Sequence, residues 1–303
     1  MGFTAAIRLL TLAPMVLMSA SLPAQIALKA KPILAKPFIK ADQNSVQVPV
    51  KIGLFLLNKA PEQGALALGH VPANTKRLVI DGRDVRFAPD GLFAVGFGRD
   101  YASSTLMTAF LDDGRNMSER QPVRKHPWDI SNLATVPHHA QSDAEFQARR
   151  PAELAQIATG RPANGESQGW RQRFVWPVHG PITTHFGAER IYSGVSGGPH
   201  SGVDVGVPQG TPVYAPADGV ITLVADHPFT LEGNLLMMDH GLNVNSAFLH
   251  LSKIIVQKGD VIHQGQLLGY SGMTGRASGP HLHWGMKWMD EKIDPMSLTG
   301  PMH

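Results

Sequence analysis

The sequence predicts a mainly β protein made of two β-rich blocks joined by a short helical linker. Asp-Gly pairs stand between apolar runs at 81–82, 90–91 and 113–114. Asp-Gly is a strong signal for a tight β-turn because glycine accepts a positive φ. In the C-terminal block, short apolar runs recur without a sustained helical period. With 303 residues, 43% of them hydrophobic and 17% charged, the chain is globular and long enough for two domains.

The chain contains no cysteine and 14 histidines. The absence of cysteine excludes disulfides, thiolate metal sites and a cysteine nucleophile. The formal net charge of +3 is too small to indicate nucleic-acid binding, so no nucleic-acid partner is expected. Ten of the histidines lie after residue 178, which places the expected chemistry in the C-terminal block.

Residues 1–24 have the pattern of an export signal peptide. Arg8 is followed by an apolar run at 9–18 and then by small residues, among them Ala24. The apolar run is shorter than the ~20 residues that a membrane span needs. We therefore expect a cleaved signal and no stable membrane anchor, with an uncleaved anchor as the alternative. Residues 25–44, rich in Lys, Pro and Ala, are predicted to be a tether.

Residues 45–130 are predicted to form an immunoglobulin-like β-sandwich, because strand-like alternation at 46–50 leads into the three Asp-Gly turns. Residues 131–170 are predicted to be a helical linker. Ser142 and Glu145 form a capping-box pattern at the start of a first helix. Pro151 is expected to open a second short helix that Gly160 closes.

Residues 171–303 are predicted to form an antiparallel β-sheet domain. The runs typical of strands are 212–215, 219–224, 235–238, 246–251, 266–270 and 281–288.

Three histidine patterns stand out in this domain. His200 lies four residues before Asp204, His250 lies within an apolar run, and His281 and His283 form an H-x-H pair. Catalytic zinc takes three nitrogen or oxygen ligands and keeps one open position. His200, Asp204 and one histidine of the pair would supply such a set.

The spacing of these residues constrains the chain path. Residues four apart in a flat strand lie ~13 Å apart, too far for one ion with bonds of ~2 Å. The chain must therefore bend between His200 and Asp204, and Gly202 is the expected place for the bend. His281 and His283 project to one face, so one can bind a metal while the other addresses the water.

Residues 174–299 resemble the lysostaphin-type zinc metallo-endopeptidases, which cut peptidoglycan. The resemblance covers, in order, Trp176-Pro177, Phe186-Gly187, the H-x-x-x-D of 200–204, residues 210–213 and 215–219, Asp239-His240-Gly241, His250-Leu251, and residues 274–283. It implies a duplicated hybrid motif-like β fold for this domain. The N-terminal sandwich and the Trp128-Asp129-Ile130 segment resemble periplasmic members from Gram-negative bacteria.

By matching motif, the resemblance implies one Zn²⁺ per chain, with the zinc ligands His200, Asp204 and His283. His250 and His281 are then the catalytic histidines, and the sequence leaves open which is the base and which donates to the oxyanion. The absence of H-E-x-x-H excludes metalloproteases with a glutamate base on that motif. The implied partner is the peptide stems of peptidoglycan. The implied location is the periplasm, with the extracellular space as the alternative.

Two other functions remain open from the sequence. A non-catalytic cell-wall regulator that activates other hydrolases is one, although relatives of that kind have lost metal ligands that this chain keeps. A zinc peptidase acting on a protein substrate is the other. The N-terminal sandwich is expected to bind a protein partner or to restrain the active site.

Overall fold

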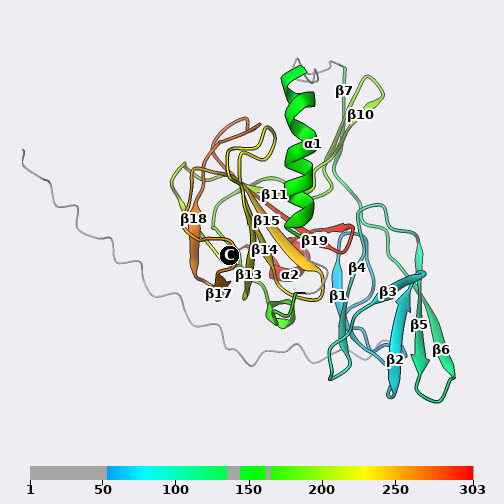
Figure 1. The fold of residues 1–303 in the computed structure, drawn as a ribbon. Helices are drawn as coiled ribbons and strands as arrows, with labels where there is room; N and C mark the ends of the chain where they lie inside the picture. Colours follow the sequence, from blue (N-terminus) through cyan, green and yellow to red (C-terminus); the bar gives the residue numbers. More distant parts are fainter. Residues whose placement is uncertain (1–52, 135–143, 162–164, 303) are drawn as a thin grey trace, which may run out of the picture. The chain divides into compact units, whose positions relative to one another are not determined.

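The computed structural model describes residues 53–134, 144–161 and 165–302 (Figure 1). The predicted signal peptide and tether lie outside the described residues. The described ranges belong to one compact unit that spans residues 40–303. Within these ranges, no helix is both long and apolar enough to cross a membrane.

The N-terminal β region contains two small antiparallel sheets. Its strands are β1 (Leu66–His70), β2 (Thr75–Ile80), β3 (Arg83–Val85), β4 (Leu92–Gly96), β5 (Ser104–Leu111) and β6 (Asn116–Pro122). β1 pairs with β4, and the second sheet has the order β3-β2-β5-β6. Two of the predicted turns are confirmed as hairpins. Gly82 connects β2 to β3 and Gly114 connects β5 to β6, with φ angles of 81° and 85°.

The core of this region follows from alternation along the strands. β5 buries every second side chain, so that one of its faces packs inward. Phe55 and Phe93 meet edge to face in the core, with ring centroids 6.3 Å apart. The mainly β character is confirmed, and the immunoglobulin-like assignment stays a prediction.

The linker contains α1 (Ala144–Thr159), a single helix. The expectation that Pro151 opens a second helix is therefore wrong, since Pro151 lies inside α1. Its missing N–H leaves the carbonyl of Gln147 without a helical donor. Both residues are exposed, so solvent can satisfy this carbonyl. The helix ends directly before Gly160, as predicted.

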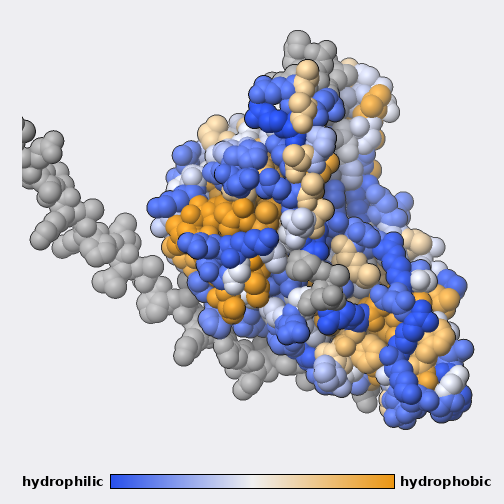
Figure 2. All heavy atoms as spheres, in the orientation of Figure 1, coloured by the Kyte–Doolittle hydropathy of each residue, from blue (hydrophilic) through white to orange (hydrophobic). Residues whose placement is uncertain are grey.

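α1 is held against the C-terminal domain by one apolar and two polar contacts. Ile157 packs in a cluster with Leu223, Phe229, Leu235 and Met237. The carboxylate of Glu153 accepts hydrogen bonds from the backbone N–H and the hydroxyl of Thr230, both at 2.7 Å. Arg150 donates two hydrogen bonds to Glu232, at 2.7 and 2.8 Å. The outer surface of α1 is mostly hydrophilic or pale in Figure 2, as expected for a helix with one buried side.

The C-terminal domain is built almost entirely of antiparallel strands. They are β8 (Ile182–Thr184), β9 (Glu189–Tyr192), β10 (Val195–Pro199), β11 (Gly202–Val205), β12 (Pro212–Tyr214), β13 (Gly219–Val224), β14 (Asn234–Asp239), β15 (Val244–Leu251), β16 (Lys253–Ile254), β17 (Val261–Ile262), β18 (Leu267–Tyr270), β19 (Leu282–Trp288) and β20 (Glu291–Ile293). The 3-10 helix η1 (Gly169–Arg171) precedes them and the short helix α2 (Met296–Thr299) follows. The six predicted strand runs match β12, β13, β14, β15, β18 and β19.

The main sheet has the order β17-β13-β14-β15-β19-β11-β8, with β20 on β19, and a smaller sheet has the order β12-β18-β16. β10 and β9 form a hairpin, and β9 also pairs in parallel with β7 (Ile130–Leu133). The linker residues 131–133 therefore form a strand where a helical segment was expected.

Side chains along β19 alternate between two faces of the main sheet. We call the face that carries Trp284 the core face and the face that carries His283 and Lys287 the site face. Trp284 is fully buried, contacts Trp176 edge to face and donates from Nε1 to the hydroxyl of Ser246. His283 and Lys287 project from the opposite face, because neighbouring residues of a strand alternate. Ile157 of α1 packs on this site face, so the linker helix lies beside the site.

Candidate metal centre and active site

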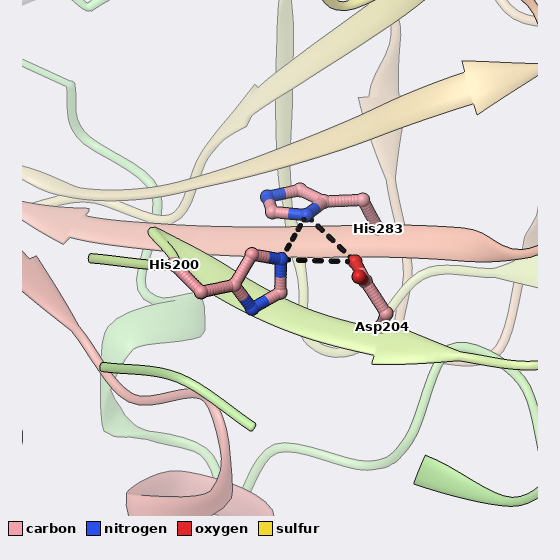
Figure 3. A group of neighbouring side chains, drawn as sticks. All are labelled: His200, Asp204 and His283. Atoms are coloured by element: carbon pink, nitrogen blue, oxygen red, sulfur yellow. Dashed lines mark hydrogen bonds and ion pairs between the residues drawn. The ribbon is translucent and has the colours of Figure 1, made fainter. Parts of the chain in front are cut away.

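His200, Asp204 and His283 come together at the junction of β11 and β19 (Figure 3). Asp204 lies on β11 directly opposite His283 on β19. Asp204 Oδ1 lies 2.8 Å from His283 Nδ1 and 3.1 Å from His200 Nε2, and the two nitrogens are 3.0 Å apart. Strand pairing therefore places two of the residues, and the segment before β11 brings in the third.

The orientation of His200 is set by a backbone group. Its Nδ1–H donates to the carbonyl of His185 at 3.0 Å, which leaves the Nε2 lone pair directed toward Asp204 and His283. Metal-binding histidines are held in the same way, with the second ring nitrogen donating to a fixed acceptor.

Glycine is required at 202 for space. A Cβ at Gly202 would lie 2.4 Å from the carbonyl oxygen of Trp284 and 2.7 Å from Nε2 of His283. His200 lies before β11 and Asp204 within it, so the two residues do not share one strand. Gly202 itself begins the strand without a positive φ, so its role is close packing against β19 rather than the predicted bend.

The predicted catalytic histidines lie next to this cluster. The rings of His250 and His281 are 4.8 Å apart between centroids, and His281 Nε2 lies 3.7 Å from Asp204 Oδ1. His250 Nδ1–H donates to the carbonyl of Thr274, and His281 Nδ1–H donates to the carbonyl of Gly279, each at 2.8 Å. Both rings are thereby held with Nε2 free to accept a proton.

His250 has an unusual backbone conformation. It lies at the end of β15 with φ of 61°, in the left-handed region that few residues other than glycine adopt. Its carbonyl comes close to Gly272, where a Cβ would lie 2.6 Å from that oxygen. Gly272 also accepts a hydrogen bond from the N–H of His281 at 3.1 Å. One small residue thus lies between the two predicted catalytic histidines.

The protonation states follow from burial and contacts. Burial disfavours ionisation of Asp204, but the close contacts of its carboxylate with the imidazoles of His200 and His283 outweigh burial and hold the pKa of Asp204 below its usual value. Burial lowers the pKa of His250 to about 4 and also lowers the pKa of His283. At neutral pH, His250 and His283 are therefore uncharged, and Asp204 is a carboxylate.

The chemistry of the three donors fits zinc. Two imidazole nitrogens and one carboxylate oxygen converge within 4.8 Å of one another, and this is a donor set of catalytic zinc sites. Ligand atoms bound ~2 Å from a tetrahedral ion lie ~3.3 Å apart, close to the separations in this cluster. Asp204 contributes one negative charge, which leaves a divalent ion with net positive charge.

Sequence reasoning missed the groups that orient these side chains. They are the backbone carbonyls of His185, Thr274 and Gly279. Every residue has such a carbonyl, so the sequence does not show which of them orient the histidines. Thr274 gave a partial signal, because it precedes the H-x-H pair within the recognised motif. Its hydroxyl donates to the carbonyl of Leu251 and accepts from the N–H of Asn234, which fixes the segment that holds His250.

The fold and site define a metallopeptidase domain. Residues 198–295 match the family described as Peptidase family M23. This range contains the candidate metal cluster, His250 and His281. Residues 198–295 are therefore similar to the domain of peptidase family M23, whose members are zinc metallopeptidases.

Relatives and one solved structure are similar to this chain. Peptidoglycan DD-endopeptidase ShyA of Vibrio cholerae is 38% identical over 141 residues, which are 46% of this chain and 32% of that protein. Peptidoglycan DD-endopeptidase ShyB of the same organism is 34% identical over 144 residues, 47% of this chain and 33% of that protein. A Pseudomonas aeruginosa crystal structure, described as a candidate M23 peptidase, is 28% identical with a TM-score of 0.62. The match covers 80% of this chain and 96% of that chain.

This chain spans about a third of the length of the two Vibrio relatives. The similarity to the Pseudomonas structure extends beyond residues 198–295, because it covers most of both chains.

Proposed function

We propose that this protein is a zinc-dependent endopeptidase that hydrolyses peptide cross-links of peptidoglycan. The observation that carries the proposal is the convergence of His200, Asp204 and His283 beside His250 and His281 within an M23 domain. The names of the Vibrio relatives support peptidoglycan as the substrate.

In this proposal, His200 Nε2, Asp204 Oδ1 and His283 Nδ1 hold the zinc. Zinc, when bound, supplies a Lewis acid that polarises a carbonyl and lowers the pKa of water. The hydrogen bond from His200 to the carbonyl of His185 keeps the ligand nitrogen aimed at the site. The direct pairing of β11 with β19 keeps the carboxylate of Asp204 opposite His283.

His250 and His281 are the proton-carrying residues in this proposal. Both rings present Nε2 as an acceptor, because their Nδ1–H groups are engaged by carbonyls. One of them takes up the proton of the attacking water, and a protonated imidazole then donates to the oxyanion or to the leaving amine. The lowered pKa of His250 keeps its ring neutral and able to accept a proton at pH 7.

We also propose export to the periplasm, with residues 1–24 as the signal peptide. The basic residue, short apolar run and small residues at the N-terminus support this assignment. A peptidoglycan substrate requires the enzyme to act outside the cytoplasm, which agrees with an exported chain.

Digestion of purified sacculi by the zinc-loaded protein tests the function. We expect cross-linked muropeptides to fall and uncross-linked stems to rise, with loss of this activity on chelation and recovery on addition of zinc. An absence of new stem ends under all metal conditions would overturn the proposal. Stimulation of another hydrolase without cleavage would support the regulator, and cleavage of proteins but not sacculi would support a protein substrate.

A further inference from the structure

A cavity of about 100 Å³ lies beside the candidate metal cluster on the site face of the main sheet. His283 forms part of its wall, together with Asn245 of β15 and Lys287 of β19. The end of the linker forms another part, through Ile157 and Arg161. The cavity therefore adjoins one proposed zinc ligand, His283, and is partly enclosed by a segment outside the M23 match.

Two polar atoms in this cavity lack partners. Among the described residues, Arg161 Nε and Asn245 Oδ1 are the buried side-chain polar atoms without a hydrogen bond. Both residues line this cavity. An unsatisfied buried donor or acceptor is costly, and two such atoms on residues of one cavity wall mark the cavity as a candidate ligand site.

The cavity also has an excess of positive charge. Arg161, Lys287 and Lys292 line it, and their side chains form no hydrogen bond or ion pair with any residue that the structure describes. The lining carboxylate is Glu232, which is already engaged by two hydrogen bonds from Arg150. The cations of the cavity are thus left without a direct counter-ion.

Burial makes this arrangement unfavourable without a ligand. Burial lowers the pKa of Arg161, and it lowers the pKa of Lys287, which is also repelled by Arg161. Glu232 and Asp290 attract Arg161, and Asp290 and Glu291 attract Lys287, without forming a hydrogen-bonded pair with either cation. A bound anion would relieve the repulsion between these two side chains.

We propose that this cavity is a subsite for a free carboxylate of the peptide stem, held by Arg161, Lys287 and Lys292. The inference rests on the proposed function, since the cavity shares His283 with the candidate metal site. It names the recognised group: the resemblance to members from Gram-negative bacteria implies stems that contain diaminopimelate, and a free carboxylate of that residue can accept two hydrogen bonds from a guanidinium.

Direct binding of two soluble stem peptides to the full chain tests this inference. One peptide carries the free diaminopimelate carboxylate and the other carries the corresponding carboxamide, and calorimetry gives Kd for each. We expect the carboxylate peptide to bind at least ~10-fold more tightly than the carboxamide, as for a charge-assisted hydrogen bond. Equal Kd values for the two peptides would overturn the inference.

Substitutions of the cavity residues test whether they bind the carboxylate. Lys287→Met and Arg161→Met are expected to weaken binding of the carboxylate peptide ~10-fold and to leave the carboxamide almost unchanged. Lys258→Met is the matched control, because Lys258 is an exposed lysine that does not line the cavity. Lys292→Met, at an exposed position on β20, provides a further variant with little risk to folding. Equal losses for both peptides in all three cavity variants would overturn the inference.

Failure of this inference and failure of the proposed function give different results. If the parent chain cleaves sacculi but binds the two peptides equally, the carboxylate subsite is wrong and the endopeptidase stands. If it discriminates between the peptides but never cleaves sacculi, the subsite stands and the endopeptidase is wrong.

Discussion

Asp204 and His283 face each other directly across β11 and β19, with Oδ1 of the carboxylate 2.8 Å from Nδ1 of the imidazole. The register of one strand pair therefore sets the distance between two of the proposed zinc ligands. A slip of β11 by one residue would turn Asp204 to the core face while His283 stayed on the opposite face. Gly202 and Gly285, also paired across these strands, give the close approach that this register needs.

Removal of a proposed ligand should remove the metal. We expect His283→Ala and Asp204→Ala to lose zinc, measured by metal analysis, and to cut sacculi at least ~1,000-fold more slowly, because the ion supplies several kcal/mol of transition-state stabilisation. His263→Ala is the control, since this histidine is largely exposed and is not a member of the cluster. Full zinc content in either ligand variant would contradict the assignment.

His281→Ala should separate metal binding from catalysis. We expect this variant to keep its zinc and to lose activity by ~100- to 10,000-fold, as for a missing proton-transfer group. Loss of zinc instead would show that His281 is a ligand.

Gly272→Ala should disturb both predicted catalytic histidines. A Cβ at position 272 would lie 2.6 Å from the carbonyl oxygen of His250. The carbonyl of Gly272 itself accepts a hydrogen bond from the N–H of His281. We expect kcat to fall ~10- to 100-fold, the scale for misplaced catalytic groups, with zinc retained. Gly279→Ala is the matched control, because a Cβ there meets nothing within 4 Å. Equal kcat values for the two variants would show that the close approach is unimportant.

Arg150→Met should loosen α1. It leaves the carboxylate of Glu232 without its two hydrogen bonds, at a cost of about 1–3 kcal/mol. Hydrogen exchange of residues 144–159 should become faster. Arg149→Met is the control, since Arg149 pairs with Glu145 on the exposed side of the same helix. Unchanged exchange in Arg150→Met would mean that Ile157 and the hydrogen bonds of Glu153 with Thr230 hold the helix without Arg150.

His240 should make stability depend on pH. It is fully buried; its Nδ1–H donates to the carbonyl of Asp218, and its Nε2 accepts from the hydroxyl of Ser246. Burial lowers its pKa from 6.5 to about 4, so the unfolded chain binds this proton more readily than the folded chain. Its contribution is therefore present above pH 6.5 and is lost as the pH falls toward 4.

Between pH 7 and pH 5, this residue should reduce the free energy of unfolding by about 2 kcal/mol. Denaturant unfolding of the parent and of His240→Gln at both pH values measures the effect. His250 and His283 titrate in both proteins, so the difference between the two proteins reports on His240. If the free energy of unfolding depends on pH in the same way in the parent and the variant, the assignment of this effect to His240 is wrong.

Strands with a clear apolar pattern or a marked turn were predictable from the sequence. Strands that form only because they pair with a neighbouring strand were not. β13 and β19 carry buried apolar runs, and Asp-Gly marked the hairpins of the N-terminal region. β10 has the sequence Val-Ser-Gly-Gly-Pro and is exposed along its length, so its strand conformation comes from pairing with β9. The single helix α1 was missed for a similar reason, because Ile157, Glu153 and Arg150 stabilise it across Pro151.

The candidate site was predictable where residue type carries the chemistry. Spacing and motif resemblance brought forward His200, Asp204, His250, His281 and His283, and the structure places them together. Their roles stay predictions until the variants are measured. Nothing in the sequence indicated that the cations of the cavity lie together. Arg161 and Lys287 are far apart in sequence and come close only because α1 packs on the sheet.

That packing of α1 has a practical consequence for anyone who isolates the catalytic part. A truncated protein starting at Ser167 would retain every proposed zinc ligand yet lose Ile157 and Arg161, and with them one side of the cavity. Such a fragment could report normal metal content and still misrepresent which peptides the intact enzyme prefers. Fragments meant for inhibitor screening or for exchange between relatives should therefore start ahead of Ala144.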